Sequence, residues 1–288
     1  MEEIIQARSD AVTGPHFKLS VSAWVGIIIL VFWVVIVFFG PALSPYTESD
    51  FVADDGFLAP SRTFLLGTDY IGRDILSRLL IGTRLTIGMA LLATCIASTV
   101  GSFLGILAAV KQGWVDALLS RLNDALLSIP GILMGLVVVA ALGSSIPILI
   151  CTTGLVYACS VFRIARALGM DIRVMDYVEV ARARGESLWW VLRHEIFPNA
   201  AIPLIVDFGI RLSFAIRFMS ALSFLGLGVQ PPHADWGSMV RENLAGLGAL
   251  SMAPIIPALA IASLTIGLNL IVDDYIARSG QEVTRRIT

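Results

Sequence analysis

The sequence predicts an all-α polytopic membrane protein with six transmembrane helices. Of its 288 residues, 57% are hydrophobic and 15% are charged, and the mean hydropathy is +0.84. A soluble domain carries about 25% charged residues, so this composition rules out a disordered or fibrous chain and argues against a water-exposed fold. Several apolar stretches reach the length of roughly 20 residues that a span requires. They are expected to be helices, because a bilayer leaves no backbone polar group unpaired and the stretches are too long for barrel strands.

The first four predicted spans lie in uncharged sequence. The first covers residues 21–39 and is expected to be retained, since Glu2 and Glu3 precede it where a signal peptide would carry positive charge. The second covers residues 85–110. Residues 125–162 form a stretch too long for one span, and the Gly-Ser-Ser-Ile-Pro sequence at 143–147 divides it into a hairpin of two spans.

The last two spans differ in charge. The fifth, residues 200–222, carries Asp207, Arg211 and Arg217, and the sixth, residues 253–272, is uncharged. Asp207 and Arg211 are four residues apart on one helix face and either pair structurally or contact a substrate. Arg217 has no such partner, so it either extends to the membrane surface or lines a pathway and attracts an anionic group such as a peptide carboxylate.

The distribution of basic residues predicts the orientation. With the N-terminus inside, thirteen Lys and Arg residues fall in inner segments and five in outer ones, so both termini are expected in the cytoplasm. The net charge of −2 argues against a nucleic-acid partner. The predicted layout is a cytoplasmic segment 1–20, a membrane domain 21–272 with outer loops 40–83 and 223–252 and an inner loop 170–199, and a cytoplasmic tail 273–288.

The inner loop is too regular to be a simple connector. Val174, Val178 and Ala181 recur at helical spacing, Gly185 interrupts the pattern, and Ser187 is placed to cap a second helix. The expected structure is a short helix across the ends of the spans, a glycine hinge and a helix that re-enters the membrane. An amphipathic interfacial helix without a partner is an equal alternative.

This loop resembles the EAA loop of bacterial ABC importer permeases. Glu179, Ala181, Gly185 and Pro198 keep the spacing of that motif, and Pro198 follows the glycine by thirteen residues. The sequence departs from the motif at Val180, Glu195 and Phe197, where Ala, Ile and Leu are usual.

Two longer strings resemble the C-type permeases of the dipeptide, oligopeptide and nickel importers. The first runs from Gly67 to Arg78 before the second span, and the other covers residues 223–232 with Asp235-Trp236-Gly237 after it. Met219 stands where that family often has Glu. The tail also lacks the family's usual ending.

The resemblance implies a type I ABC importer permease in the bacterial inner membrane. Its partners would be a homologous permease, two cytoplasmic ATP-binding subunits and an external substrate-binding protein, and its cargo di- or oligopeptides. Nickel, glutathione, opines and oligosaccharides remain alternatives, as does a stand-alone secondary transporter or channel. The residues implied to couple to the ATPases are Glu179, Ala181, Gly185 and Pro198, and those of an outer gate loop are Leu225, Gly226, Gly228 and Gln230.

The outer strings also have a physical interpretation. Gly67, Thr68 and Asp69 suit a turn and a helix cap, and Asp69–Arg73 and Asp74–Arg78 have the spacing of ion pairs on an outer helix that leads into the second span. The glycine-rich gate loop is expected either to shape the mouth of a pathway or to form a tight turn with a structural role only.

The chain itself is not expected to hold a cofactor. A Walker A loop requires a Gly-Lys-Ser/Thr ending, which neither Lys18 nor Lys111 provides, so ATP and Mg²⁺ are assigned to partner subunits. The three histidines are scattered, and Cys95, Cys151 and Cys159 have no metal-binding spacing, so no metal site or catalytic residue is predicted. Gly101-x3-Gly105 and Gly131-x3-Gly135 have the spacing of close helix contacts.

Overall fold

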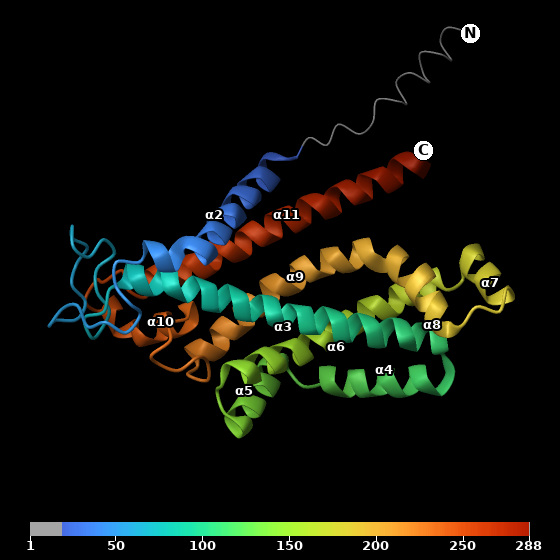
Figure 1. Ribbon diagram of the computed structural model, residues 1–288, viewed down its shortest axis with the longest axis horizontal. Helices are drawn as coiled ribbons and strands as arrows, with labels where there is room; N and C mark the ends of the chain where they lie inside the picture. The colour runs from blue at the N-terminus through green and yellow to red at the C-terminus, as the bar shows by residue number, and fades with distance from the viewer. Residues whose placement is uncertain (1–18, 288) are drawn as a thin grey trace, which may run out of the picture.

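Long helices that run side by side make up most of the chain (Figure 1). The structure, a computed structural model, describes residues 19–287 and the side chains of residues 19–278. The predicted segment 1–20 therefore lies almost wholly outside the described residues. The long helices are α2 (Val21–Leu43), α3 (Ile75–Lys111), α6 (Ile146–Ile172), α9 (Phe197–Phe224) and α11 (Ile255–Ile287). The all-α prediction is confirmed.

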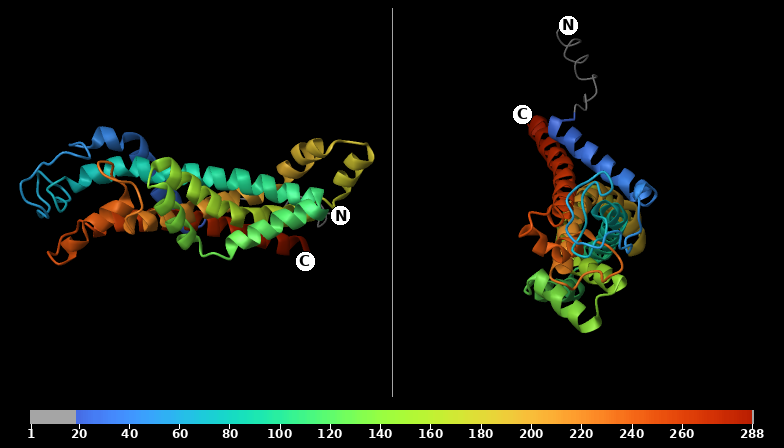
Figure 2. Two further views of the ribbon diagram at one scale, coloured as in Figure 1. Left: turned by 90° about the horizontal axis from the view of Figure 1, so that it is seen from below. Right: turned by 90° about the vertical axis from the view of Figure 1, so that its left-hand side faces the viewer.

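Shorter helices connect the long ones. Between α3 and α6 lie α4 (Gly113–Leu127) and α5 (Gly131–Leu142), and between α6 and α9 lie α7 (Asp176–Ala183), α8 (Leu188–Val191) and the π-helix η1 (Leu192–Ile196). The helix α10 (Trp236–Glu242) and the 3₁₀ helix η2 (Leu244–Leu247) precede α11. The α7 loop and the α10 loop lie at opposite ends of the bundle, which we call the α7 end and the α10 end (Figures 1 and 2).

Within residues 19–287, four helices have the length and composition of membrane spans, namely α2, α3, α6 and α11. They contain the predicted first, second, fourth and sixth spans. The helix α9 contains the predicted fifth span and is 28 residues long, but it carries three charges. These features are compatible with the six-span layout.

The predicted third span is not one straight helix. The axes of α4 and α5 meet at 85°, across a break that contains Pro130. Proline has no N–H to donate and disfavours helical backbone at the residue before it, so Pro130 favours a kink or a break in the helix at this position. The break at residues 143–147 is confirmed: Gly143 adopts φ +95°, and α6 begins at Ile146 with Pro147 in its first turn.

The helix expected before the second span is the beginning of that span. Asp74 caps α3 through a hydrogen bond from the Ser77 N–H at 2.8 Å, and the helix continues for 37 residues. At 1.5 Å per residue it is about 55 Å long, which exceeds a hydrocarbon core of about 30 Å. Likewise α11 continues without a break to Ile287, so the predicted tail extends the sixth span as a helix as far as the structure describes it.

The helices α3 and α6 form the central pair of the bundle, and glycines allow their close approach. A Cβ atom on Gly105 would lie 2.5 Å from the Phe162 carbonyl oxygen and 2.9 Å from the Ala165 Cβ, and one on Gly101 would lie 2.6 Å from the Ala158 oxygen. The Gly101-x3-Gly105 spacing thus marks a helix contact as predicted. Gly135 faces Phe218 of α9 in the same way.

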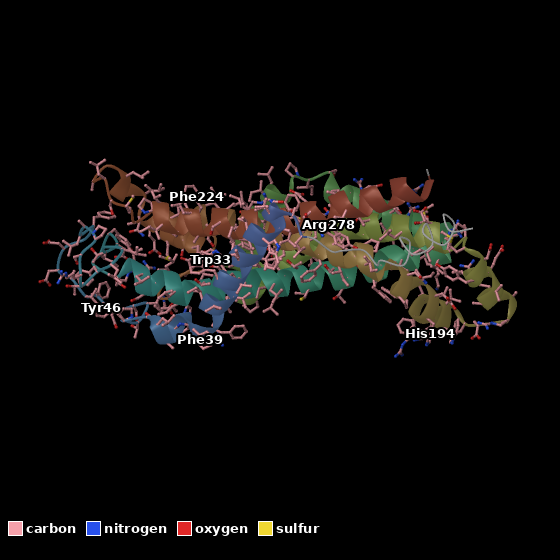
Figure 3. All side chains as sticks on the ribbon, turned by 90° about the horizontal axis from the view of Figure 1, so that it is seen from above. Trp33, Phe39, Tyr46, His194, Phe224 and Arg278 are labelled. Atoms are coloured by element: carbon pink, nitrogen blue, oxygen red, sulfur yellow. The ribbon has the colours of Figure 1, made fainter. Side chains whose placement is uncertain are left out.

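Apolar side chains form two buried clusters. One centres on Trp236 and Trp33, whose rings are 4.7 Å apart, and joins α10 to α2, α3 and α9. The other lies at the α7 end and joins α3, α6, α7, η1 and α9 through Ile106, Ala165, Ala181 and Ile196. In Figure 3, Tyr46 and His194 mark the two ends of the molecule, with Trp33 between them.

We expect Gly105→Leu to destabilise the bundle, because the new side chain has no room between α3 and α6. Overpacking of this kind costs about 1–3 kcal/mol. Gly88→Leu is the matched control on the same helix, since nothing lies within 4 Å of a Cβ at that position. Thermal unfolding of the purified protein in detergent measures the difference. Equal loss of stability in the two variants would show that this contact does not set the packing.

Candidate functional site

The α7 loop has the helix, hinge and re-entry helix that the sequence predicts. Gly185 ends α7 with φ +81°, the Gly185 N–H donates to the Arg182 oxygen at 2.9 Å, and the Glu186 N–H donates to the Ala181 oxygen at 3.2 Å. These two bonds form a Schellman motif, in which a left-handed residue closes the helix. A side chain at Gly185 would meet no neighbour within 4 Å but would strain this backbone.

The two faces of α7 have different surroundings. Val178 and Ala181 are fully buried against the α7-end cluster, whereas Tyr177, Glu179 and Val180 are exposed. Val174 was predicted to share a helix face with Val178 and Ala181, but it precedes α7 and is exposed. Ala181 was expected to lie beneath a partner, yet it packs inside its own chain.

Pro198 lies in a continuous helical run and not at an isolated helix start. The run comprises α8, η1 and α9, and Ser187 caps it with a hydrogen bond from the Trp190 N–H at 3.2 Å. Pro198 has no N–H to donate to the carbonyl four residues before it. The chain widens into a π-helix over Leu192–Ile196, immediately before this proline. Pro198 itself is exposed.

The gate loop ends α9 with the same motif. Gly226 has φ +88°, its N–H donates to the Ser223 oxygen at 3.0 Å, and the Leu227 N–H donates to the Leu222 oxygen at 3.0 Å. The Gln230 amide then donates to the carbonyls of Gly226 and Gly228 at 3.3 and 3.0 Å. A Cβ at Gly228 would collide with Ser223, while Leu225 is exposed. The loop is therefore a tightly hydrogen-bonded turn at the α10 end.

Beside this loop lies a cluster of four charged residues, of which Asp69, Arg73 and Arg78 are buried and Glu242 is partly buried. The Asp69 Oδ2 accepts from Arg73 Nε at 2.7 Å and from Arg78 Nη1 at 2.6 Å. The Glu242 Oε2 accepts from Arg73 Nη2 at 2.8 Å and from Arg78 Nη1 at 2.9 Å. The Arg78 side chain is fully buried. The cluster joins the segment before α3 to the end of α10.

The predicted Asp69–Arg73 pair is confirmed, but the predicted Asp74–Arg78 pair is wrong. Asp74 instead accepts hydrogen bonds from the Ser77 backbone and hydroxyl at 2.8 and 2.6 Å, as the cap of α3. Arg78 is therefore available to Asp69 and Glu242. Glu242 was not expected at this site, because it lies far away in sequence and has no local pattern.

The helix α10 is inserted between α2, α3 and α9. Trp236 is fully buried, and its backbone N–H donates to the Thr86 hydroxyl at 3.1 Å. Asp235 caps α10 through hydrogen bonds from the N–H groups of Gly237 and Ser238. Burial raises the pKa of Asp235, although its hydrogen bonds with Ser238 oppose the change.

The intramembrane charges of α9 form one pair and one unpaired arginine. Arg211 lies 3.1 Å from Asp207, so this predicted pairing is present. Arg217 is exposed and has no ion-pair partner among the described side chains. Its guanidinium stacks on the ring of Phe214, 4.6 Å from the centroid, and Arg211 approaches the same ring at 5.6 Å. Phe214 was not predicted to belong to this site, although it lies three residues from each arginine in the sequence, which places all three on one side of a helix.

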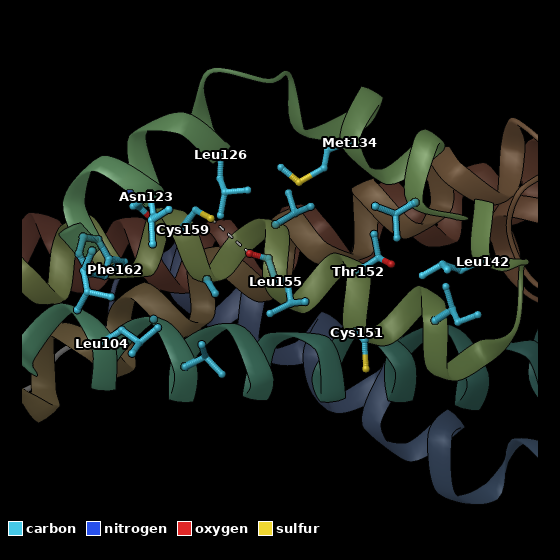
Figure 4. A pocket seen from close by; sticks show the side chains of 18 residues that line it. Leu104, Asn123, Leu126, Met134, Leu142, Cys151, Thr152, Leu155, Cys159 and Phe162 are labelled. Carbon is cyan, nitrogen blue, oxygen red and sulfur yellow. Dashed lines mark hydrogen bonds between the residues drawn. The ribbon is translucent and has the colours of Figure 1, made fainter. Parts of the chain in front are cut away.

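Among the described residues, two pockets lie between α6 and the α4–α5 pair. One, of about 440 Å³, lies between the α4–α5 break, α6 and α9, with Arg211, Tyr157 and Ser160 in its wall. The other, of about 490 Å³, is lined by apolar side chains of α3, α4, α5 and α6 apart from Asn123 and Thr152 (Figure 4). Because it presents few polar groups, the second pocket is poorly suited to a hydrophilic solute.

Comparison with known proteins identifies the family. Residues 101–279 match the family model described as binding-protein-dependent transport system inner membrane component, and residues 16–60 match the N-terminal TM domain of oligopeptide transport permease C. The chain belongs to the binding-protein-dependent permease family. It is the permease subunit of an ABC importer, and the resemblance seen in its motifs is confirmed.

Curated relatives align over most of the chain. The glutathione transport system permease protein GsiD of Pectobacterium atrosepticum is 33% identical over 83% of this chain and 80% of its own length. GsiD of Escherichia coli O6:K15:H31 is 33% identical over 90% and 86%. The dipeptide transport system permease protein DppC of Alkalihalophilus pseudofirmus is 31% identical over 90% and 85%. These relatives are transport permeases, in keeping with a membrane subunit that is not itself an enzyme.

We expect Arg78→Met to lower the free energy of unfolding by about 3–5 kcal/mol, because it leaves two buried carboxylates with one cation. Arg163→Met is the matched control: its pair with Asp124 is about 60% exposed on both sides, and such pairs contribute about 0–1 kcal/mol. Adding Glu242→Gln to Arg78→Met restores neutrality and should recover part of the loss. Denaturant unfolding in detergent checks all three. If Arg78→Met unfolds like the wild type, the cluster does not stabilise the fold.

Proposed function

We propose that this permease imports di- or oligopeptides across the bacterial inner membrane. It would pair with a homologous permease, receive cargo from an external substrate-binding protein, and couple to two cytoplasmic subunits that bind ATP and Mg²⁺. The observation that supports this most strongly is the α7 loop, whose exposed face and Gly185 turn stand clear of the bundle at one end (Figure 1). Two of the three relatives above are glutathione permeases, so the tripeptide glutathione is the second candidate cargo.

The packing of α7 suggests how coupling would work. The exposed Glu179 would contact the ATPase subunits, for example by accepting from an arginine or a backbone N–H. The buried Ala181 would act differently, by fixing α7 to α3, α6, η1 and α9 through the α7-end cluster. Closure of the ATPase subunits would then move α7 and these helices together. Gly185 would shape the turn that follows α7, and Pro198 would lie in the helical run that leads from this turn into α9.

The other predicted sites fit the same proposal. The pocket beside Asp207, Arg211 and Arg217 would belong to the translocation path. Leu225, Gly226, Gly228 and Gln230 at the opposite end from α7 would form the outer gate. The α7 end would face the cytoplasm, with both termini inside and residues 40–83 and 223–252 outside.

The orientation is testable by thiol labelling in intact cells, with the three native cysteines replaced. Asp54→Cys and Arg182→Cys both place the new thiol at an exposed position, at opposite ends of the bundle. We expect an impermeant maleimide to label the first from outside and the second only after permeabilisation, because the basic residues concentrate on the α7 side. The reverse pattern would invert the topology.

The coupling role is testable with Gly185→Asp, which combines left-handed strain with an added charge. The strain alone costs roughly 1–2 kcal/mol, and we expect ATP-driven uptake of a dipeptide to fall about tenfold or more. Gly185→Asn should retain more uptake, since Asn has nearly the shape and the backbone tolerance of Asp but adds no charge. The assay uses the reconstituted importer with its binding protein and compares a dipeptide with glutathione.

Gly143→Asp is the matched control for this variant. Gly143 is also left-handed, at φ +95°, and a Cβ there has no neighbour within 4 Å. It should leave ATPase co-purification unchanged. If Gly185→Asp retains full ATPase binding and uptake, the coupling role is wrong and an interfacial helix without a partner replaces it. If the wild type imports no peptide, the proposed cargo is wrong.

A further inference from the structure

The unpaired Arg217 calls for a physical explanation. A charged side chain within a membrane-spanning helix is costly, and such residues usually face a cavity or a partner. The nearby Arg211 forms an ion pair with the carboxylate of Asp207, at 3.1 Å. Arg217 instead makes a cation–π contact with the face of the Phe214 ring, which attracts a cation without neutralising its charge.

The surroundings of Phe214 concentrate positive charge beside a cavity. Phe214 and Arg211 both line the pocket of about 440 Å³, and none of the described residues in its wall is Asp or Glu. The Arg217 guanidinium is held on the ring that forms part of this wall, at 4.6 Å from its centroid. Two guanidinium groups and one carboxylate leave the site with one positive charge in excess.

The rest of the wall suits a short organic solute. The rings of Tyr157 and Phe218 meet edge to face, with centroids 5.6 Å apart, and give an aromatic surface, and Ser160 adds a hydroxyl. The Tyr157 hydroxyl is already used, because it donates to the Phe214 carbonyl at 3.3 Å. This bond also holds α6 to α9 at the arginines. The charge available to a ligand is therefore that of Arg217.

We propose that this pocket is a binding site for the carboxylate of the cargo, with Arg217 as the residue that contacts it. The inference rests on the proposed import of peptides, whose free C-terminus carries such a group. A guanidinium fits a planar carboxylate with two parallel hydrogen bonds. An anionic lipid headgroup offers similar chemistry, so the experiment must separate the two sources.

The test measures occupancy of the pocket directly, without transport. Ser160→Cys places a thiol in the pocket wall of the assembled importer, with Cys95, Cys151 and Cys159 replaced by alanine and the complex held in phosphatidylcholine nanodiscs. The rate of alkylation by a maleimide is measured with N-acetyl-trialanine, which has a free carboxylate, and with its C-terminal amide, which does not. The two probes otherwise have the same shape.

We expect the acid to slow alkylation about tenfold more than the amide, the size of one charge-assisted contact. Arg217→Gln should abolish this difference, Arg217→Lys should retain part of it, and Arg163→Gln on α6 should leave it unchanged. Equal protection by acid and amide in the chain with Arg217 overturns the proposal, even if the Gln variant fails to assemble. So does an acid effect that survives Arg217→Gln.

Two further measurements distinguish peptide binding from lipid binding in the pocket and test the proposed cargo separately. If phosphatidylglycerol in the nanodisc protects the thiol as well as the peptide acid does, the site binds lipid and the proposal is overturned. Peptide uptake measured on the same complexes tests the proposed function separately: a complex that imports no peptide but shows Arg217-dependent protection by the acid supports the carboxylate site while excluding peptide import.

Discussion

A cluster of four charged residues, three buried and one partly buried, holds the α10 end of this permease together. Arg73 and Arg78 share the carboxylates of Asp69 and Glu242, at distances of 2.6 to 2.9 Å. Each carboxylate removed from water would be costly alone, but two cations and two anions in mutual contact leave the cluster neutral. Because the four residues come from the segment before α3, from α3 itself and from α10, the arrangement of this end depends on their pairing. Trp236 then fixes α10 against α2 and α3.

The two ends of the molecule use the same local device for different purposes. Gly185 and Gly226 both close a helix in the left-handed conformation, with the same pair of backbone hydrogen bonds. At the α7 end the turn directs α7 across the bundle and leaves one of its faces exposed. At the α10 end the turn packs against Ser223 and is closed by Gln230. In the proposed function, the Gly185 turn lies where the ATPase subunits would transmit motion to the permease. The Gly226 turn would restrict the passage of cargo at the outer side.

The helices between these two ends differ in the residues at their contacts. The contact between α3 and α6 depends on glycines, because a side chain at Gly101 or Gly105 would collide with the facing helix. Such close packing suits a rigid scaffold. In α9, by contrast, Arg211 lines a pocket, and Arg211 and Arg217 both approach the ring of Phe214. Since charge is costly in a membrane unless it is paired or serves a pathway, α9 is the helix most directly suited to contact a hydrophilic cargo.

The sequence by itself determined the fold class, the long spans, the helix-and-hinge form of the α7 loop and the family. These depend on local features: runs of apolar residues, the spacing of glycine and proline, and short motifs. Gly185 permits a left-handed turn without a Cβ clash, so the sequence indicated where the loop could turn, and the structure gives it φ +81°. The bend at Pro130 was also marked in the sequence, although the apolar composition obscured it.

Only the tertiary structure decided which distant groups meet. Arg78 has the spacing to pair with Asp74, but Asp74 caps α3, and Arg78 pairs with Asp69 and with Glu242, which lies 164 residues away. Ala181 fits a partner-facing motif, yet its own chain buries it completely. Arg217 lies on the ring of Phe214, and this ring lines a pocket that three separate segments form. The physical reason is that local spacing fixes which face of a helix a residue occupies, whereas its partner is fixed by how the helices pack.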